Sequence, residues 1–136
     1  MKFLEKLLGA SRRNRSLLCI GLDTVIEKIP EKLLKEEDPI FSFNKSIIDE
    51  TSDLVCAYKL NAAFYEKEGA GGWLSLKKTI DYMPDDVMVI GDGKRGDIGN
   101  SAKKYAEAFL STLGFDAITV NPYLGYDSIL PFVDCK

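Results

Sequence analysis

The chain has 136 residues, 46% of them hydrophobic and 29% charged, which is typical of one ordinary soluble domain. It contains no histidine, which excludes a Ser-His-Asp triad, a Cys-His pair and an imidazole metal ligand, so its chemistry depends on carboxylates and lysines. The formal net charge of −3 and a single short basic cluster at residues 12–15 leave no basic stripe for a phosphate backbone, so we expect no nucleic-acid partner.

Four short apolar runs, rich in Val, Ile and Leu, predict four β-strands. Each run is continuously apolar instead of alternating, which is typical of strands buried on both faces of a parallel sheet. The runs are residues 17–22, 54–58, 87–90 and 117–120.

Segments with helical periodicity separate these runs. Asp38 followed by Pro39 predicts the start of the first helix, because aspartate is a good N-cap and proline is favoured at the first helical position. A second helix is predicted over residues 73–83, where a proline ends it, and the strongest helical pattern covers residues 102–113, where a glycine closes it. A further helix begins near residues 127–130.

Strands that alternate with helices predict an α/β fold with a parallel sheet. Two architectures fit: an open doubly wound sheet, or part of a (β/α)₈ TIM barrel. A complete barrel takes about 250 residues, so residues 1–136 would cover about the first four βα units, the N-terminal half of a single barrel domain. The chain stops just as a helix begins, so the sequence looks cut off.

The cysteines and apolar segments indicate a cytoplasmic protein with no membrane partner. Cys19 and Cys56 lie in apolar runs, and we expect them to be buried thiols of a reducing compartment. The longest uncharged apolar run has about six residues, far below the roughly 20 that cross a bilayer. Residues 1–8 are too short and too charged for a signal-peptide core.

Each predicted strand is followed by ionic or amide side chains. The carboxyl ends of parallel strands share one edge of a sheet, where binding sites are built, although polar residues also follow strands simply as caps and turns. Lys59 is harder to explain as a cap or turn residue, because an ammonium group within apolar sequence is costly to bury unless it pairs with a carboxylate. The residues are Asp23, then Lys59 and Asn61, then Asp92 and Lys94, and finally Asn121.

The densest polar segment is residues 89–101. Asp92 and Lys94 are two positions apart, so in an extended chain their side chains point to the same side. Asp97 follows at the entry to the next helix, where an N-cap carboxylate is favoured. With Lys59 these groups make two ammonium and two carboxylate groups that can converge, and a pair 4 Å apart is worth roughly 4 kcal/mol before desolvation. We expect such an array to keep Lys94 protonated, ready to act as an acid or as a fixed cation beside developing negative charge.

Three other interpretations of this segment are weaker. Residues 91–96 match the dinucleotide-binding pattern G-x-G-x-x-G, but Asp92 would aim a carboxylate at the pyrophosphate and the motif lies in the third unit instead of the first. A hairpin turn at Asp92-Gly93 disagrees with the helical pattern that follows. A magnesium site built from Asp92 and Asp97 is possible, but Lys94 between them competes as the counter-cation.

Residues 92–102 resemble the D-x-K-x-x-D-I-G-x-T signature of orotidine 5′-phosphate decarboxylases, with Ser101 in place of the usual threonine. Residues 19–23, 58–65 and 119–125 are similar to the longer-chain bacterial branch of that family. The resemblance covers the chain from about residue 17 to its end and extends to the order and spacing of the motifs.

This resemblance implies a (β/α)₈ barrel enzyme of pyrimidine biosynthesis that converts orotidine 5′-phosphate to uridine 5′-phosphate and CO₂, as a homodimer with shared active sites and without a cofactor or metal. By analogy Asp23 and Lys59 would hold substrate hydroxyls, with Lys59 also in the charge array. Asp92 would face the scissile carboxylate, and Lys94 would protonate the C6 carbanion. The other residues expected to act on the substrate are Asn61 and Asn121, and Asp97, Ile98 and Ser101 reaching into the partner's site.

Two alternatives stay open. A hexulose-phosphate synthase or keto-gulonate-phosphate decarboxylase of the same superfamily would use a similar motif with magnesium. An inactive half-barrel fragment would only bind a nucleotide or pair with another half. The phosphate-binding loops of such barrels follow strands seven and eight, so we expect the isolated 136-residue chain to be inactive.

Overall fold

The computed structural model describes residues 3–135, over which four parallel strands form one sheet in chain order, β1-β2-β3-β4. Each strand pairs with its neighbour in a parallel register, for example Ile20 with Tyr58 and Tyr58 with Val89. This order is expected when each strand is joined to the next by a helix that crosses over one face of the sheet. The strands are β1 (Cys19–Gly21), β2 (Ala57–Asn61), β3 (Met88–Arg95) and β4 (Ala117–Val120).

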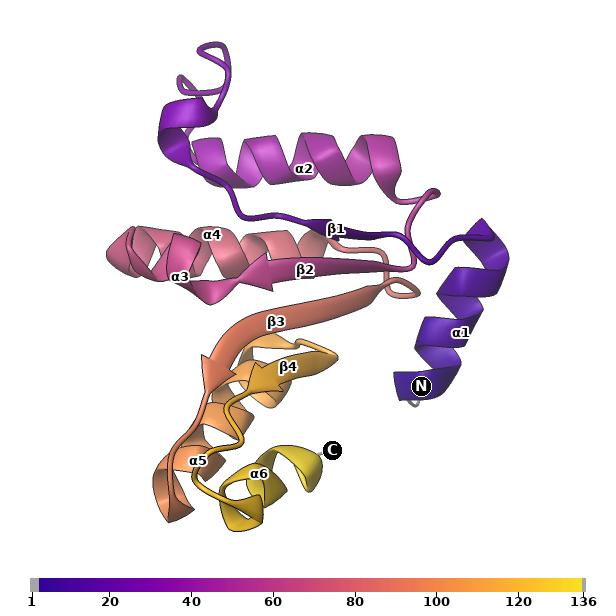
Figure 1. The fold of residues 1–136 in the computed structure, drawn as a ribbon. Coiled ribbons are helices and arrows are strands. Elements are labelled where there is room, and N and C mark those ends of the chain that lie inside the picture. The colour runs from indigo at the N-terminus through magenta and orange to yellow at the C-terminus, as the bar shows by residue number, and fades with distance from the viewer. Residues whose placement is uncertain (1–2, 136) are drawn as a thin grey trace.

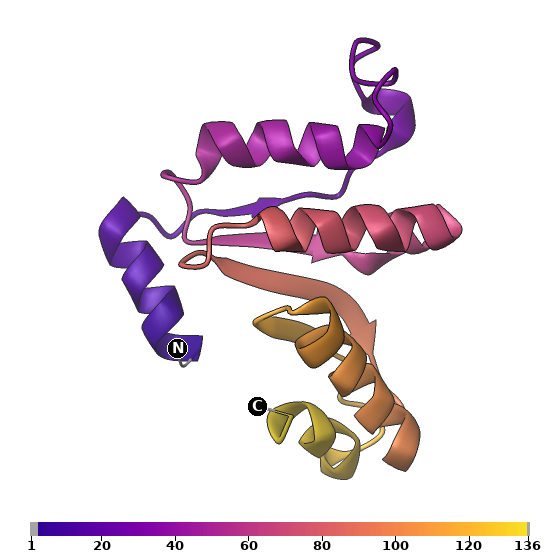
Figure 2. The same cartoon turned by 180° about the vertical axis from the view of Figure 1, so that it is seen from behind.

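The connecting helices cover one face of the sheet, as Figures 1 and 2 show from opposite sides. No helix of residues 3–135 covers the other face (Figure 1). A doubly wound sheet carries helices on both faces, so this arrangement is that of a barrel, in which the uncovered face is the interior. The helices are α2 (Pro39–Thr51), α4 (Gly69–Tyr82), α5 (Gly99–Ala106) and its π-helical continuation η2 (Glu107–Leu113), with the short η1 (Ile26–Lys28), α3 (Ala62–Glu66) and α6 (Tyr126–Val133).

The predicted helix boundaries are confirmed where the sequence carries an explicit cap. Asp38 accepts a hydrogen bond of 3.1 Å from the Phe41 amide, and Pro39 is the first residue of α2. Gly114 closes the third helix with a φ of +90°, in the left-handed region that glycine adopts without strain. That third helix differs from the prediction in its interior, because after Ala106 it widens into the π-helix η2.

The main core lies between the sheet and its helices. Tyr58, Leu60 and Val89 project from the strands into it, and Phe109 from η2 and Leu76 from α4 meet them there. Because side chains alternate along a strand, the next positions on β2 and β3 project to the opposite, interior face. Lys59 and Asp92 therefore belong to the interior of the barrel.

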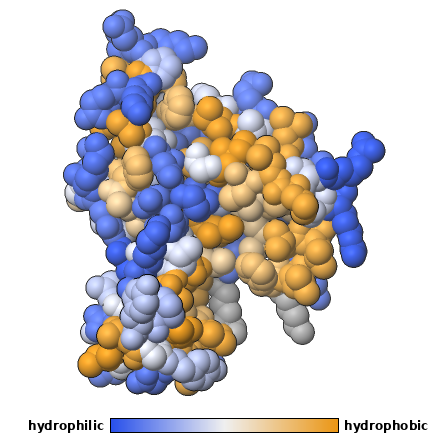
Figure 3. All heavy atoms as spheres, in the orientation of Figure 1, coloured by the Kyte–Doolittle hydropathy of each residue, from blue (hydrophilic) through white to orange (hydrophobic). Residues whose placement is uncertain are grey.

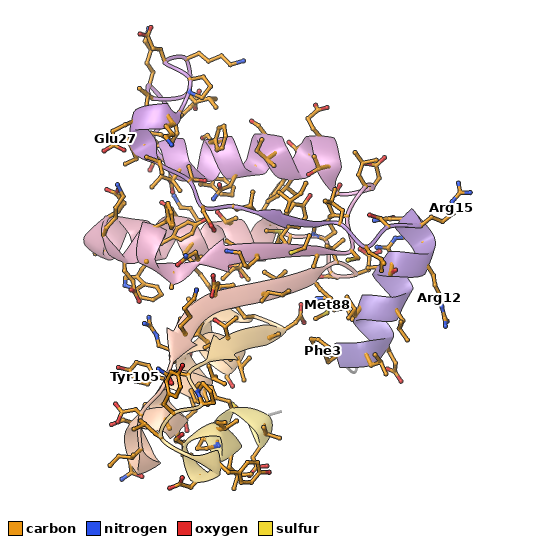
Figure 4. All side chains as sticks on the ribbon, in the orientation of Figure 1. Phe3, Arg12, Arg15, Glu27, Met88 and Tyr105 are labelled. Atoms are coloured by element: carbon orange, nitrogen blue, oxygen red, sulfur yellow. The ribbon has the colours of Figure 1, made fainter. Side chains whose placement is uncertain are left out.

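An N-terminal helix that was not predicted, α1 (Phe3–Asn14), lies at the end of the sheet where the strands begin. Its Ala10 is fully buried in a small cluster with Ala57 and Met88, and Figure 4 shows Met88 at the end of β3 nearest α1. The Lys6 ammonium forms a 2.7 Å ion pair with Asp116, just before β4. α1 therefore closes the interior at the end opposite to the strand termini that carry the polar residues.

The first strand is less buried than predicted. Cys19 is exposed, Leu17 is 88% exposed, and β1 itself covers only Cys19–Gly21. The reason is that β1 lies at the edge of the sheet, with no strand on its outer side among residues 3–135. Cys56 is buried, as expected, because it precedes an inner strand. No helix within the described range has the length and apolar character needed to cross a membrane.

Candidate active site

Four charged side chains from three consecutive strands meet at the carboxyl-terminal edge of the sheet. The Lys59 ammonium of β2 lies 3.2 Å from both carboxylate oxygens of Asp23, which follows β1, and 3.3 Å from Oδ2 of Asp92. The Lys94 ammonium lies 2.6 Å from Oδ1 of the same Asp92. The groups thus form an alternating row, Asp23, Lys59, Asp92 and Lys94, in which each charge has opposite charges beside it.

Asp92 is the centre of this row. Its side chain is only 11% exposed, and each carboxylate oxygen accepts a hydrogen bond from an ammonium group. The hydrogen bond from Lys94, together with those from Thr119 and Lys59, lowers the pKa of Asp92 to about 2 against the opposing effect of burial. Asp92 is therefore an anion at neutral pH.

The two lysines differ in their surroundings. Burial acts to lower the pKa of Lys59, but its hydrogen bonds to Asp23 and Asp92 outweigh that effect and raise the pKa. The Lys94 side chain is 70% exposed, so its ammonium is held by Asp92 on one side and is open on the other. An open, charged ammonium at the strand edge can contact a bound molecule and give it a proton.

A bulge in β3 directs this part of the site. Gly91 pairs with Ile118 and Arg95 with Val120, so an advance of four residues along β3 corresponds to an advance of two along β4. Lys94 has a φ of 45°, in the left-handed region that non-glycine residues seldom adopt. Such bulges disrupt the ladder locally and change the direction of side chains near functional sites.

The two predicted asparagines lie beside the array and have local partners. The Asn61 backbone amide donates to Oδ1 of Asp23 over 3.1 Å, and the Asn61 side-chain oxygen caps α3 by accepting from the Ala63 backbone amide. The Asn121 side chain follows β4 at the same edge, is exposed, and accepts from the Tyr123 amide over 3.0 Å. Both side-chain oxygens are thus held by backbone amides at the carboxyl-terminal edge of the sheet.

The segment that follows β3 departs from the predicted array. Within residues 3–135 the second carboxylate of the row is Asp23, and Asp97 instead accepts a 2.8 Å hydrogen bond from the adjacent Ile98 amide. Asp97 is also not the N-cap, because α5 begins at Gly99 and Ile98 holds the cap position without a side-chain bond. Ile98 is 64% exposed and Ser101 is exposed. Ile98 and Ser101 are thus open to solvent in this chain, and the Asp97 carboxylate bonds to its own neighbour.

Two further contacts at this edge were not predicted from the sequence. Thr119 of β4 hydrogen-bonds both Asp92 and the Lys94 amide, and the only sign of it in the sequence is a hydroxyl inside the apolar run 117–120. Arg95 pairs with Glu66 of α3, and its guanidinium lies 5.1 Å from the centre of the Phe109 ring. Sequence spacing alone does not place these partners together.

The donors of the described residues do not form a metal site. Among the described residues no three His, Cys, Asp or Glu side chains are grouped so that they could hold an ion. In the array itself, the places beside both Asp92 oxygens are taken by the ammonium groups of Lys59 and Lys94.

The fold is part of a (β/α)₈ barrel, because its parallel strands follow chain order and its helices cover one face. The charged residues lie at the carboxyl-terminal edge, where the active sites of such barrel enzymes lie. Comparison with known families gives the particular one: a family model described as orotidine 5′-phosphate decarboxylase / HUMPS family matches residues 16–135. The chain belongs to this family.

Individual relatives agree with this assignment. A curated orotidine 5′-phosphate decarboxylase of Herpetosiphon aurantiacus is 52% identical over 132 residues, which are 97% of this chain and 49% of the relative. One of Christiangramia forsetii is 55% identical over 125 residues, 90% of this chain and 46% of the relative. The chain therefore spans about half the length of the curated relatives it matches.

Solved structures show the same relation. The structure of Leishmania donovani OMP decarboxylase superimposes with a TM-score of 0.83 at 34% identity, and the match covers 98% of this chain and 49% of that one. Leishmania donovani UMP synthase matches with a TM-score of 0.84 at 35% identity, covering 98% of this chain and 28% of that one. The predicted fold, about four units of a TIM barrel, is confirmed.

Proposed function

We propose that residues 1–136 are the N-terminal half of a single barrel domain, and that the complete barrel converts orotidine 5′-phosphate to uridine 5′-phosphate and CO₂ in pyrimidine biosynthesis. The relatives that are 52% and 55% identical to this chain over the matched residues carry the name of that enzyme. The observation that carries the proposal is the row Asp23, Lys59, Asp92 and Lys94 at the carboxyl-terminal edge of the strands.

The reaction needs a cation close to a carbanion. When the bond between C6 and the carboxylate breaks, CO₂ leaves and the electron pair stays at C6 in the plane of the ring, where little delocalisation is available. The Lys94 ammonium stabilises that charge and then donates its proton to C6, forming the new C–H bond. The neutral amine regains a proton from solvent. No step of this sequence calls for a cofactor or metal.

The remaining groups of the row hold the substrate and the lysines. Asp23 and Lys59 bind hydroxyl groups of the nucleotide, for which a carboxylate and an ammonium supply an acceptor and a donor. Asp92 faces the scissile carboxylate and keeps Lys94 in place through their 2.6 Å contact. Asn61 and Asn121, at the same edge, contribute amide groups to the substrate.

The active sites are shared in a homodimer. Ile98 and Ser101 are exposed after β3, and the Asp97 carboxylate accepts a hydrogen bond from the Ile98 backbone amide. In the proposed dimer Asp97, Ile98 and Ser101 enter the partner's site, where Asp97 adds a second carboxylate close to Lys94.

The test is turnover by a completed barrel, in which this chain replaces the matching half of the Herpetosiphon aurantiacus relative. We expect this protein to release CO₂ from orotidine 5′-phosphate, and to do so at an unchanged rate after treatment with a chelator. No turnover by a folded completed barrel would contradict the proposal. Activity that requires magnesium and acts on a sugar phosphate would instead identify the hexulose-phosphate synthase or keto-gulonate-phosphate decarboxylase chemistry.

A nucleotide-binding protein without catalysis is the second alternative. Titration with uridine 5′-phosphate separates it from the proposal, since that alternative predicts binding by the completed barrel without any turnover of orotidine 5′-phosphate.

A further inference from the structure

Thr119 is the side chain through which β4 contacts both charged residues of the β3 bulge. Its hydroxyl oxygen accepts a hydrogen bond of 3.0 Å from the backbone amide of Lys94. The same hydroxyl donates a hydrogen bond of 2.8 Å to Oδ1 of Asp92. Its one proton and one of its lone pairs are therefore both committed to residues that the proposed reaction uses.

The first of these bonds replaces a missing backbone contact. In the irregular stretch between Gly91 and Arg95, β3 has more residues than β4 can pair with. The Lys94 amide lies in this stretch, and it finds a side-chain hydroxyl where a regular strand would offer a carbonyl oxygen. The contact supports a residue whose φ of 45° is costly for a side chain other than glycine.

The second bond fixes the carboxylate that holds the lysine. Oδ1 of Asp92 accepts from Thr119 over 2.8 Å and from the Lys94 ammonium over 2.6 Å. The Asp92 carboxylate is thus held at Oδ1 by Thr119 and Lys94 and at Oδ2 by Lys59. Thr119, Asp92 and Lys94 form a closed ring of contacts that includes both the backbone and the side chain of Lys94.

We propose that Thr119 is a positioning residue for the decarboxylation, and that its hydroxyl holds the backbone of Lys94 and the carboxylate of Asp92 so that the ammonium points at C6. This inference rests on the proposed function and adds to it a residue on the fourth strand. Thr119 itself need not touch the substrate, so its effect is on the chemical step and not on binding.

A packing role for Thr119 makes a different prediction. Threonine and valine have nearly the same shape and both favour strands, so a side chain that only packs would be replaced by valine without loss. Serine keeps the hydroxyl but lacks the methyl group. The pair Thr119→Val and Thr119→Ser therefore separates the hydroxyl from the packing.

The experiment measures kcat and KM of the completed barrel with orotidine 5′-phosphate for both variants. Thr119→Val is expected to lower kcat about 10- to 100-fold, the effect of losing a hydrogen bond to a charged group, with KM within about threefold of the parent. Thr119→Ser is expected to retain most of the kcat. Thr112→Val is the matched control, because Thr112 is exposed on η2, away from the array, and kcat should not change.

A second readout does not depend on activity. Hydrogen exchange of the Lys94 amide should be faster in Thr119→Val than in the parent and Thr119→Ser, because the amide has lost its acceptor. Unchanged exchange in Thr119→Val, or a kcat within twofold of the parent, would overturn the inference. A serine variant as slow as the valine variant would overturn it too. If the parent barrel has no activity, the proposed function fails, and the exchange measurement still decides whether Thr119 holds Lys94.

Discussion

Asp92 is the residue on which the geometry of the site depends. It is the most buried member of the row, with 11% of its side chain exposed, and it is the contact that Lys59 and Lys94 share. A largely buried carboxylate is tolerated because opposite charges satisfy both of its oxygens. Removal of either lysine would leave one Asp92 oxygen without its ion pair, so the two lysines and Asp92 are energetically coupled.

This coupling predicts how Asp92 titrates. In the completed barrel its carboxyl group, followed by NMR, should remain ionised down to about pH 3, in keeping with the pKa of about 2. Lys94→Met should raise the pKa, because it removes the largest of the interactions that lower it, and Lys104→Met, remote from the row, should leave it unchanged. An Asp92 that titrates at its ordinary value of 3.8 in the parent would contradict the geometry.

The same shift has a consequence for stability. The pKa of Asp92 is lower in the folded protein than in the unfolded chain, so the carboxylate stabilises the fold above about pH 4. This contribution, about 2 kcal/mol, is lost as the pH falls from about 4 to 2.

At the scale of the elements, the bulge in β3 packs against the π-helix η2 beneath the site. The β3 bulge contains Gly93, where an added Cβ would lie 3.0 Å from the Phe109 ring. Phe109 belongs to η2, and Gly91 has the same ring against it. The π-helix thus supports the bulged strand from behind with an aromatic ring, and glycines allow that ring to approach the backbone.

The close packing of α4 against α3 can be tested at Gly72, a residue of α4. A Cβ at Gly72 would lie 1.9 Å from the backbone oxygen of Tyr65, a clash that no side chain can relieve. Gly72→Ala should therefore lower the free energy of unfolding of the completed barrel by about 3 kcal/mol or more, measured by chemical denaturation.

Gly71→Ala is the matched control in the same helix. Nothing lies within 4 Å of its added Cβ, so the substitution should raise the free energy of unfolding by about 0.5 kcal/mol, as alanine is the better helix former. Equal effects of the two substitutions would contradict the close contact between α3 and α4.

The sequence predicted the elements whose signals are local. Apolar runs indicated the strands, and Asp38, Pro39 and Gly114 marked helix ends because their effects act on neighbouring backbone. α1 was missed because it carries many charged residues and only Ala10 within it is buried. The bulge and the contacts of Thr119 depend on the pairing of β3 with β4, which no local pattern expresses.

At the scale of the whole molecule, apolar surface remains open on the half barrel. Hydrophobic side chains gather over α1 in Figure 3, where Phe3 and Leu4 are 51% and 60% exposed. The interior face of the sheet also lacks a covering helix among residues 3–135. Because the chain spans about half of its relatives, we expect the 136 residues alone to release no CO₂ from orotidine 5′-phosphate. Measurable turnover by this chain would contradict that expectation.

Sharing of sites between subunits can be tested by mixing variants. In completed barrels, Asp97→Ala and Lys94→Ala should each be nearly inactive alone. After subunit exchange, mixed dimers would contain one site with both residues, so about a quarter of the parent activity should return. No recovery in dimers shown to have exchanged subunits would place Asp97 in the site of its own chain.

The role of Lys94 as the cation and proton donor is tested most directly by single-turnover decarboxylation in the completed barrel. Lys94→Ala should slow the chemical step about 100- to 10,000-fold, while Lys104→Ala, which removes an exposed lysine paired with Glu107, should leave it unchanged. A Lys94→Ala protein that decarboxylates within tenfold of the parent rate would contradict the account.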